Sequence, residues 1–384
     1  MKKMLMLASV ASMIDQFNMP NIQLLQEMGY EVHVACNFEE GNTCSKEKIL
    51  DLKRRLKNMQ IKYYQIDFSR SVSNLEKNLK AYRQVYLLMK REKYEFVHCH
   101  SPIGGVIGRL VGHRTRTKVI YTAHGFHFFK GAPIKNWILY YPVERFLARY
   151  TDVLITINKE DYHRAKNFKA KNVEYIPGVG VDIERFIKSN TSRKDKRKEL
   201  GISNEAFILL SVGELSSRKN HQVVIDALGK IKDTNIYYVI AGNGRLYNEY
   251  LKSAQEYGIV DQVLLLGPRT DINELCQMAD VFVHPSVREG LGIAPLEAMA
   301  AGLPLISSYV NGIKDYTKDG VTGLCIQNPR DVDAMKNAIL KMKDNKEFCN
   351  QCAERNKKIA RKFDIKKSKE ITREIYKRFE LIQE

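Results

Sequence analysis

The chain has 384 residues, of which 44% are hydrophobic and 28% charged, and its formal net charge is +18. This composition excludes the disordered and fibrous classes, and the length suggests two domains of ordinary size. No apolar run approaches the roughly 20 residues needed to span a bilayer, so we expect a soluble protein. Seven cysteines without regular spacing argue against a disulfide framework and favour a reducing compartment.

The first apolar segment, residues 4–14, allows two interpretations. Because it follows two lysines, it imitates the apolar core of a short signal peptide. Alternatively, residues 4–10 form a buried strand, followed by a helix around residues 20–28 and a second strand in GYEVHVAC. We favour the second interpretation, since it explains all of these residues and the first explains only some of them.

Short apolar strands and amphipathic helices alternate along the rest of the chain. The helical stretches include residues 220–231 and 247–257. Continuously apolar strands separated by helices predict an α/β fold with doubly wound parallel sheets, in which ligands bind beyond the carboxyl ends of the strands. The predicted strands lie in FVHCH, KVIYTAH, DVLITIN, VEYIP, FILLSVG, IYYVIAG, VLLLG, VFVHP and LPLISS.

The alternation breaks near the midpoint of the chain, at PGVGVDIERF and the charged run that follows it. We therefore expect residues 178–200 to link an N-terminal domain, residues 1–177, to a C-terminal domain, residues 201–365. Formal charge is unevenly divided, with +16 in residues 1–200 and +2 in residues 201–384. The basic half either faces an anionic partner, such as a membrane surface, a nucleic acid or a phosphorylated substrate, or is an ordinary lysine-rich surface.

The most informative motif is HPSVREGLGIAPLEAMAAG, which starts at His284. It follows a predicted strand, residues 281–284, and leads into a helix near Pro295, a residue suited to the first helical position. Its glycines allow the backbone to approach a ligand, and a helix N-terminus behind such a loop stabilises phosphate. Glu289 in the loop and Glu297 in the first helical turn are placed to bracket a ligand rich in hydroxyl groups. For Glu297 the alternative is a capping carboxylate, but no Ser or Thr stands three residues earlier.

A second motif, SVGELSSRKNHQVVIDAL, joins a predicted strand to a helix. Gly213 begins the loop, and Arg218 and Lys219 stand just before the helix, where they could neutralise a diphosphate leaving group. Two adjacent cations carry little information alone, so this interpretation depends on the first motif.

Four histidines lie at the ends of two strands. His98 and His100 end one strand, and His124 and His127 follow the next, within VIYTAHGFHFFKGAP. No carboxylate or cysteine completes a metal site of usual spacing around them. We expect His98 to be a buried, hydrogen-bonded histidine, leave His100 and His127 open between that role and a site role, and expect His124 to face a cleft.

Two further motifs are poor metal candidates. Cys349 and Cys352 form a single C-x-x-C without a second pair, and a structural zinc site wants four ligands. The sequence DVD, residues 331–333, lies where a late helix is expected to begin. We therefore predict no metal site.

On these motifs the chain resembles the retaining nucleotide-sugar glycosyltransferases of family 4, in particular those of bacterial exopolysaccharide and capsule assembly. The specific signal is E-x7-E, formed by Glu289 and Glu297, and YTAHGFHFFKGAP and IPGVGVD also resemble this subfamily. The resemblance covers essentially the whole chain. It implies the GT-B fold, two Rossmann-like domains facing a central cleft, with a C-terminal helix, about residues 366–384, that crosses back to the N-terminal acceptor domain.

The resemblance also implies roles for individual residues. Glu289 is expected to contact the transferred sugar, Glu297 to bind the ribose hydroxyls, and His124 to stand near the anomeric carbon. Further donor-binding residues are expected in the phosphate loop, in the base-binding GPR turn and in the glycine loop, namely Gly213, Arg218, Lys219, Gly267, Arg269, Gly290, Leu291 and Gly292.

The chain departs from the family pattern at several positions. Glu214 stands where members often carry an arginine after the glycine of the phosphate loop, and the first loop lacks the usual glycine pair. Met13 and Asn18 occupy positions where similar capsule enzymes have histidines. The two-cation clamp and the recognition of the acceptor are therefore where this chain is expected to differ.

The expected activity is transfer of a hexose or N-acetylhexosamine, with retention, from a nucleotide-diphosphate donor, for which UDP is the expected carrier. The acceptor would be a lipid-linked, polyprenyl-type glycan, and neither a metal nor another cofactor is required. We expect a cytoplasmic protein, peripheral on the inner face of the cell membrane, with an anionic membrane surface and no nucleic acid as partner. The alternatives are another GT-B enzyme, such as an epimerase or phosphorylase, or a non-catalytic membrane- or nucleic-acid-binding protein.

Overall fold

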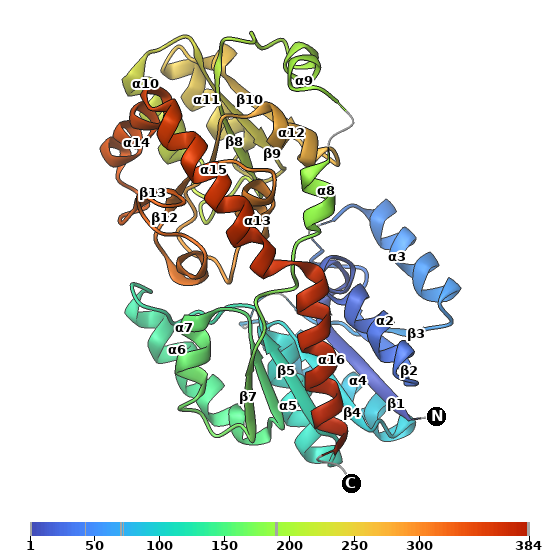
Figure 1. Cartoon of the computed structure of the whole chain (residues 1–384). Coiled ribbons are helices and arrows are strands. Elements are labelled where there is room, and N and C mark those ends of the chain that lie inside the picture. The colour runs from blue at the N-terminus through green and yellow to red at the C-terminus, as the bar shows by residue number, and fades with distance from the viewer. Residues whose placement is uncertain (1, 43, 70, 72, 189–190, 382–384) are drawn as a thin grey trace. The chain divides into compact units, whose positions relative to one another are not determined.

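The computed structural model describes residues 2–42, 44–69, 71, 73–188 and 191–381. Contacts divide the chain into two units, Met1–Val179 with Ser368–Glu384, and Gly180–Lys367 (Figure 1). Each unit is a parallel sheet with helices packed on it, so the predicted α/β class is confirmed.

The sheet of the first unit has seven strands within the described residues, in the order β3-β2-β1-β4-β5-β6-β7. The order reverses between β1 and β4, which pair directly. The N-terminal residues therefore form a central, buried strand, as the favoured interpretation of that segment predicts. The strands are β1 (Lys3–Val10), β2 (Glu31–Asn37), β3 (Lys62–Gln65), β4 (Phe96–His100), β5 (Lys118–Ala123), β6 (Val153–Thr156) and β7 (Asn172–Tyr175).

Helices of the first unit connect successive strands and leave two buried apolar layers, one on each side of the sheet. Their apolar residues recur at helical spacing, which buries one face of each helix against β-branched residues of the strands. These helices are α1 (Ala11–Met13), α2 (Met19–Glu27), α3 (Lys46–Asn58), α4 (Leu75–Glu92), α5 (Pro102–Thr115), α6 (Ile134–Leu147) and α7 (Lys159–Ala165).

The last helix, α16 (Ile365–Leu381), belongs to the first unit from Ser368 onward. Its buried face carries aromatic residues into the first apolar layer, with the ring of Phe379 5.2 Å from that of Phe96. The hydroxyl of Tyr376 lies 2.8 Å from Nδ1 of His98 on β4. In Figure 1 this red helix lies along the strands of the first unit.

The second unit contains a six-stranded sheet within its described part, in the order β10-β9-β8-β11-β12-β13. Here the order reverses between β8 and β11, which pair in parallel. The strands are β8 (Phe207–Val212), β9 (Ile236–Ala241), β10 (Val263–Gly267), β11 (Val281–His284), β12 (Leu305–Ser308) and β13 (Gly323–Ile326). The helices are α8 (Ile183–Ile187), α9 (Arg193–Glu199), α10 (Gln222–Ile231), α11 (Tyr247–Glu256), α12 (Ile272–Met278), α13 (Ile293–Ala300), α14 (Val332–Asp344) and α15 (Lys346–Ala360).

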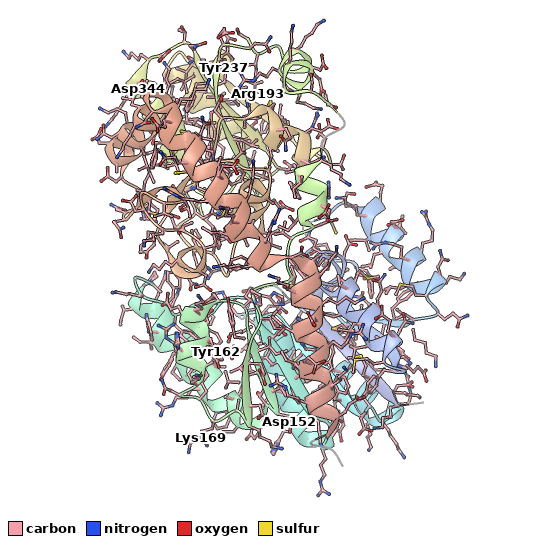
Figure 2. All side chains as sticks on the ribbon, in the orientation of Figure 1. Asp152, Tyr162, Lys169, Arg193, Tyr237 and Asp344 are labelled. Carbon is pink, nitrogen blue, oxygen red and sulfur yellow. The ribbon has the colours of Figure 1, made fainter. Side chains whose placement is uncertain are left out.

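The segment expected to be a linker, residues 178–200, instead carries α8 and α9, and its residues from Gly180 belong to the second unit. Arg193, labelled in Figure 2, donates to the carbonyl of Ala279 at 2.7 Å and pairs with Asp280 at 2.5 Å. The neighbouring guanidinium of Arg197 is buried and also binds Asp280, at 2.9 Å. A charged run that suggests an exposed linker therefore holds the start of the second unit onto its sheet.

Three details of the predicted elements differ from the structure. The edge strands β3 and β13 were not predicted, because short edge strands carry little apolar pattern of their own. Helix α13 begins at Ile293, so Pro295 is its third residue rather than its first. Glu297 accordingly lies in the second helical turn, not the first.

Neither of the motifs set aside as metal candidates has an unusual environment. Asp331 caps α14, because its side chain accepts a hydrogen bond from the amide of Ala334. Cys349 and Cys352 are free thiols on α15. Among the described helices, none combines the length and the apolar character that crossing a membrane demands.

Candidate functional site

The second unit brings two loops together at the point where its strand order reverses. One loop follows β8 and spans residues 213–221, and the other follows β11 and spans residues 285–292. In doubly wound sheets, loops at such a reversal diverge to opposite sides and leave a crevice where ligands bind. Both predicted motifs of the C-terminal half therefore meet at this one edge of the sheet.

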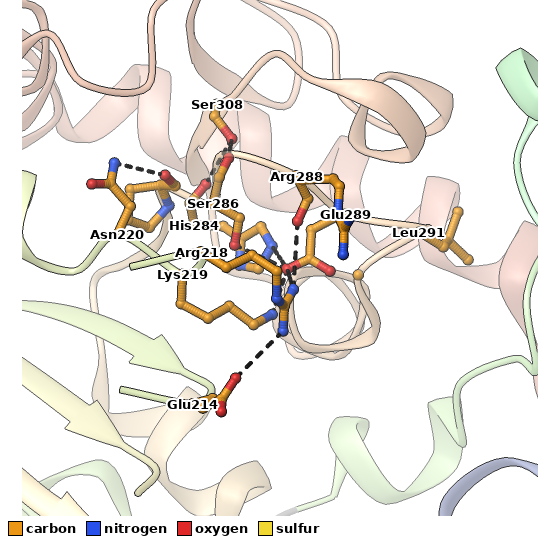
Figure 3. A network of polar contacts seen from close by, with 12 residues as sticks. Glu214, Arg218, Lys219, Asn220, His284, Ser286, Arg288, Glu289, Leu291 and Ser308 are labelled. Carbon is orange, nitrogen blue, oxygen red and sulfur yellow. Dashed lines mark hydrogen bonds and ion pairs between the residues drawn. The ribbon is translucent and has the colours of Figure 1, made fainter. Parts of the chain in front are cut away.

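Backbone contacts join these two loops (Figure 3). The amide of Val287 donates to the carbonyl of Arg218 at 2.9 Å. The side-chain amide of Asn220 donates to the carbonyl of Pro285 at 3.1 Å. Asn220 has a left-handed backbone (φ 59°), which asparagine tolerates better than most residues. The relative position of the two loops is thus set by a main-chain hydrogen bond and a side-chain to main-chain hydrogen bond as well as by charge.

Glu289 is the centre of a charged cluster at this edge. Its Oε1 lies 2.5 Å from Nζ of Lys219 and 3.0 Å from Nη1 of Arg218, and it accepts a hydrogen bond from the hydroxyl of Ser286 at 2.9 Å. Nε2 of His284 is 3.5 Å away. Figure 3 shows these side chains converging on the one carboxylate. The sequence predicted Glu289, Arg218 and Lys219 as site residues, and the structure places all three in direct contact.

The electrostatics of the cluster favour the ionised carboxylate. Burial disfavours the charge on Glu289, but the cations of Lys219 and Arg218 and the hydrogen bond with His284 hold the pKa of its carboxyl well below its usual range. Burial lowers the pKa of His284, so this ring is neutral near pH 7. The cluster therefore contains two cations that share one buried anion.

Glu214, the departure from the family pattern, lies at the outer edge of this cluster. Its carboxylate is exposed and stands 3.8 Å from Nη2 of Arg218. Arg218 thus faces a carboxylate on two sides, Glu214 and Glu289, whereas Lys219 contacts only the second among the described residues. Of the two cations, Lys219 is the more buried.

The glycine loop, residues 290–292, is held by side chains from outside the motif. The hydroxyl of Tyr316 donates to the carbonyl of Leu291 at 2.9 Å. Gly312 packs so closely that a Cβ there would lie 1.8 Å from the carbonyl oxygen of Gly290. Gly292 precedes α13 with a left-handed φ of 84°, which favours glycine. The loop is therefore positioned tightly enough to present its backbone to a ligand.

Gly213, at the start of the other loop, also has a steric reason to be glycine. A Cβ at this position would lie 3.2 Å from Cε of Lys219. The absence of a side chain lets the Lys219 stem lie over the end of β8 and reach Glu289. The position of Gly213 in the predicted donor-binding set therefore has a physical basis, although its contact with a donor stays a prediction.

Glu297 has a different environment from Glu289. It is half-buried on α13, and burial raises the pKa of its carboxyl to about 7, with the charge of Arg185 offsetting only part of this effect. A carboxyl of this kind gains strongly from ligand groups that donate hydrogen bonds to it. Its capping alternative is unsupported, since α13 has no side-chain cap and begins four residues earlier.

Gly267 is the last residue of β10, and Arg269 follows it. In the sheet, β9 separates β10 from β8, so these residues do not adjoin the loops after β8 and β11. Gly267 ends the strand with a left-handed φ of 68°. The guanidinium of Arg269 is occupied, with Nε 2.8 Å from Oδ1 of Asp271 and Nη2 3.0 Å from Glu199. The structure does not bring these two residues into the charged cluster, and their role in base recognition stays a prediction.

The first unit places three of the predicted histidines together, also near the reversal of strand order. His98 and His100 lie on β4 with ring centroids 4.2 Å apart, and Nδ1 of His100 is 3.1 Å from Nε2 of His124. His98 is satisfied on both sides, by Tyr376 and by the hydroxyl of Thr122, each at 2.8 Å. This is the buried, hydrogen-bonded state expected for His98.

Burial keeps this histidine cluster neutral. It lowers the pKa of His124 to about 4 and that of His98 to about 3, and it holds the pKa of His100 well below its ordinary value. His124 is half-buried, whereas Nε2 of His100 is buried and has no hydrogen-bond partner among the described residues. His124 is thus the member that reaches toward solvent.

The remaining predicted residues of the first unit have structural partners. The ring of His127 lies 4.5 Å from that of Tyr140, and its carbonyl accepts from Asn136 at 3.0 Å. Asn18 is buried and donates to the carbonyl of Met13 at 3.0 Å. Met13 and Asn18 lie in the segment that follows β1. Strand β1 pairs with β4 at the point where the strand order reverses.

Sequence reasoning missed several residues of the cluster. His284 and Ser286 stood inside the quoted motif, and His284 ends a strand as His100 does, so a signal existed for it. Tyr316 and Gly312 had no such signal, because they reach the glycine loop only through the fold. No group of three or more His, Cys, Asp or Glu side chains with the arrangement of a metal site occurs among the described residues.

Comparisons with known proteins identify the family. Residues 22–185 match the family described as Glycosyltransferase Family 4, and residues 192–359 match Glycosyl transferases group 1. The chain is 38% identical over 383 residues to EpsD of Bacillus subtilis, a protein named as a glycosyltransferase, covering 98% of this chain and 96% of that one. It is 32% identical, over 79% of this chain and 80% of the other, to a UDP-Gal:alpha-D-GlcNAc-diphosphoundecaprenol alpha-1,3-galactosyltransferase of Escherichia coli.

Solved structures show the same fold at low sequence identity. Anabaena HepE, solved with UDP and glucose, matches with a TM-score of 0.77 at 19% identity over 99% of this chain and 100% of that one. A sucrose-phosphate synthase of Thermosynechococcus elongatus matches with a TM-score of 0.80 at 18% identity over the full length of both chains. The two parallel-sheet units are therefore the Rossmann-like domains of the GT-B fold that the resemblance implies. With two relatives above 30% identity, each covered to more than three quarters, and both halves matched, the chain belongs to glycosyltransferase family 4.

Proposed function

We propose that this glycosyltransferase moves a hexose or N-acetylhexosamine, with retention at the anomeric carbon, from a UDP-sugar to a lipid-linked glycan acceptor. The observation that carries the proposal is the cluster of Arg218, Lys219 and Glu289 at the reversal point of the second sheet. The two cations are present before a diphosphate arrives and outnumber the one buried carboxylate between them, while Glu214 at the outer edge is exposed. The carboxylate of Glu289 can accept hydrogen bonds from a sugar.

The relatives support the choice of donor and acceptor. The Escherichia coli relative is named for transfer of galactose from UDP-galactose to a sugar carried on undecaprenyl diphosphate. HepE was solved with UDP, with UDP and glucose, and with UDP-glucose. A polyprenyl-diphosphate acceptor and a uridine diphosphate donor are therefore the chemistry we assign.

In this mechanism the leaving diphosphate gains charge as its bond to the sugar breaks. Lys219 and Arg218 stabilise that charge from fixed positions, which lowers the barrier because little reorganisation is needed. The amides of Gly290 to Gly292 face the donor, Glu289 accepts from the sugar, and Glu297 accepts from the ribose hydroxyls. His124, kept neutral by burial, serves as a hydrogen-bond partner near the anomeric carbon.

Retention places the acceptor hydroxyl on the face of the sugar from which the diphosphate departs. The diphosphate oxygens on that face can take the hydroxyl proton as the new bond forms, so no second carboxylate is required for the proton. This reaction needs no metal or other cofactor in the roles assigned here. Magnesium dependence of turnover would contradict that part of the proposal.

We also propose that the protein works as a peripheral protein on the cytoplasmic face of the cell membrane, where its lipid-linked acceptor resides. Counted along the sequence, the first unit carries +13 and the second +5. A surface with this excess of lysine and arginine is attracted to anionic lipid. Residues 368–384 add no net charge to the first unit, so the excess comes from residues 1–179.

A thermal-shift panel of UDP, GDP, ADP and their common sugars tests the donor site. Because a ligand that binds only the folded state stabilises it, UDP and one UDP-sugar should raise the melting temperature of the wild-type protein. The shift should disappear in Glu297→Ala and persist in Glu354→Ala, which removes an exposed carboxylate of the same unit. Absence of a shift with every nucleotide would contradict the proposal.

Transfer itself is tested with a radiolabelled UDP-sugar and a polyprenyl-diphosphate-linked monosaccharide. The expected product carries the label in the lipid phase, and its NMR coupling constant shows the same anomeric configuration as the donor. An inverted product would overturn retention while leaving the transferase activity in place.

A further inference from the structure

Helix α6 (Ile134–Leu147) exposes an apolar surface that the interior of the first unit does not use. Five large hydrophobic side chains on this one helix, Ile134, Ile138, Leu139, Val143 and Phe146, are between 42% and 74% exposed. Single exposed hydrophobic residues are ordinary, but a contiguous group marks an interaction surface. Successive members of this group are four, one, four and three residues apart, so at 3.6 residues per turn all five fall within about half of the helix circumference.

The opposite side of α6 is also apolar and holds the helix on the protein. The ring of Trp137 lies 5.7 Å from that of Phe128, and the ring of Tyr141 lies 5.7 Å from that of Phe168. Glu144 is buried and pairs with the buried Arg109 at 2.8 Å. Helix α6 thus carries apolar side chains both on the side that packs against the protein and on the side that is exposed.

The exposed charged residues of α6 and of the chain at its two ends are all basic. Lys135 and Arg145 are exposed on the helix itself, and Lys130 and Arg149 are exposed at its two ends. The acidic residue of the helix, Glu144, points inward to Arg109 and contributes nothing to this surface. The exposed side of α6 therefore combines large apolar side chains with uncompensated positive charge.

Helix α4 of the same unit shows that this combination is not general. It also exposes leucines, among them Leu79 and Leu87, but its exposed charges have both signs, including Glu76 and Lys80. Mixed charges keep such a helix solvated. Of these two helices, α6 is the one whose surface fits an anionic bilayer, because lipid headgroups neutralise its cations while the apolar side chains enter the acyl boundary.

We propose that α6 is the membrane-contacting element of this protein, with Ile134, Ile138, Leu139, Val143 and Phe146 inserting into an anionic leaflet and Lys130, Lys135, Arg145 and Arg149 binding its headgroups. The inference rests on the proposed function, since it names the surface through which the enzyme meets the membrane that holds its acceptor. Because Trp137, Tyr141 and Glu144 hold the helix from the inner side, insertion needs no unfolding of the first unit.

The test is binding of the full-length protein to vesicles, followed by sedimentation. Vesicles of phosphatidylcholine alone are compared with an equimolar mixture of phosphatidylcholine and phosphatidylglycerol. Wild type should bind the mixture and not phosphatidylcholine alone, and binding should weaken at about 0.5 M sodium chloride, where headgroup charges are screened. Ile138→Ser with Leu139→Ser should weaken binding to the mixture about tenfold or more.

One further variant serves as a control, and another tests the contribution of the charges. Leu79→Ser with Leu87→Ser removes equally exposed leucines from α4 and should leave vesicle binding unchanged. Lys135→Glu with Arg145→Glu should abolish the preference for phosphatidylglycerol. Each variant is checked for the UDP-induced thermal shift, and retention of that shift shows that the fold and the donor site are intact.

The outcomes separate this inference from the proposed function. A protein that responds to UDP but does not bind either vesicle, or whose α6 variants bind as well as wild type, overturns the role of α6 and leaves the glycosyltransferase proposal standing. A protein that fails to respond to any nucleotide overturns the proposed function instead. Concentration-dependent dimerisation that Ile138→Ser with Leu139→Ser abolishes would assign the surface to a second copy of the chain and also overturn the inference.

Discussion

The two units place polar side chains at the reversal point of their sheets in opposite ways. In the second unit, Glu289 is buried and charged, and Lys219 and Arg218 compensate it at 2.5 and 3.0 Å. In the first unit, His98, His100 and His124 lie together and are kept neutral by burial. The crevice at the reversal point thus holds a compensated charge in the sheet of the second unit and neutral hydrogen-bonding groups in the sheet of the first.

This difference follows from what each site is proposed to bind. A diphosphate carries its charge into the site and needs cations that are present before it arrives. A sugar or an acceptor hydroxyl is neutral, and charged histidines would bind counterions rather than the hydroxyl. Substitutions in the charged cluster of the second unit and in the histidine cluster of the first should therefore give responses of different kinds.

The largest effect is expected from Lys219→Ala. Because Lys219 is the more buried cation and contacts Glu289 directly, its loss should reduce turnover by about 100-fold or more through weaker stabilisation of the leaving diphosphate. Initial rates at saturating donor measure this. Lys230→Ala, which removes an exposed lysine paired with Asp333, should have no effect. Near-normal turnover of Lys219→Ala would show that other groups stabilise the leaving diphosphate.

The pH dependence of donor binding should report Glu297. Its carboxyl has a pKa raised to about 7 by burial, so below that pH the folded protein holds a proton that must leave before the group can accept from ribose. Affinity for a UDP-sugar should therefore fall about tenfold for each pH unit below 7 and be constant above about pH 8. Calorimetric titration of wild type and Glu297→Gln measures it. The variant should bind weakly at every pH, and an unchanged slope in Glu297→Gln would assign the titration to another group.

A smaller effect is expected from Glu289→Gln, which should strengthen the binding of UDP although it removes a residue of the site. In the free protein the carboxylate of Glu289 occupies the two cations that a diphosphate would use. Removing its charge should tighten the binding of UDP alone by about fivefold while turnover falls, since the contact with the sugar is lost. Calorimetry with UDP and initial rates are measured on the same preparation. Weaker UDP binding in the variant would show that Glu289 positions the cations rather than competing for them.

The smallest effect is expected on the unfolding free energy of the first unit, which contains the histidine cluster. Because burial lowers the pKa of His98 from 6.5 to about 3, the unfolded chain binds a proton that the folded one does not. The unfolding free energy is therefore highest above pH 6.5 and falls as the pH drops toward 3, by at most about 1.4 kcal/mol per pH unit for this one group. Urea unfolding of the first unit, followed by the fluorescence of the single tryptophan, Trp137, measures the slope.

His98→Asn should reduce that slope between about pH 6.5 and pH 5, even though it also lowers stability at pH 7 by removing contacts with Tyr376 and Thr122. His163→Asn, an exposed residue of the same unit, should leave the slope as in wild type. An unchanged slope in His98→Asn would place the acid sensitivity of this unit in other groups.

Local pattern was sufficient to predict most of the elements. Strands such as residues 281–284 were predicted with the bounds they have in the structure, because a buried parallel strand is a short continuous apolar run between turns. The start of α13 was misplaced by two residues, since proline is well tolerated anywhere in the first turn, where its missing N–H has no partner to lose. The edge strand β3 was missed because its residues are exposed or half-buried.

The sequence alone determined the family, the alternation of strands and helices, and the residue types of the donor loops, because these depend on motifs that are contiguous in the chain. Tertiary structure decided which loops become neighbours, since the strand order β9-β8-β11-β12 is set by sheet packing and not by local preference. It also decided that Tyr316 and Gly312 hold the glycine loop, and that Arg269 is occupied by carboxylates. For α6 only the packing of the fold shows which of its apolar side chains are left exposed.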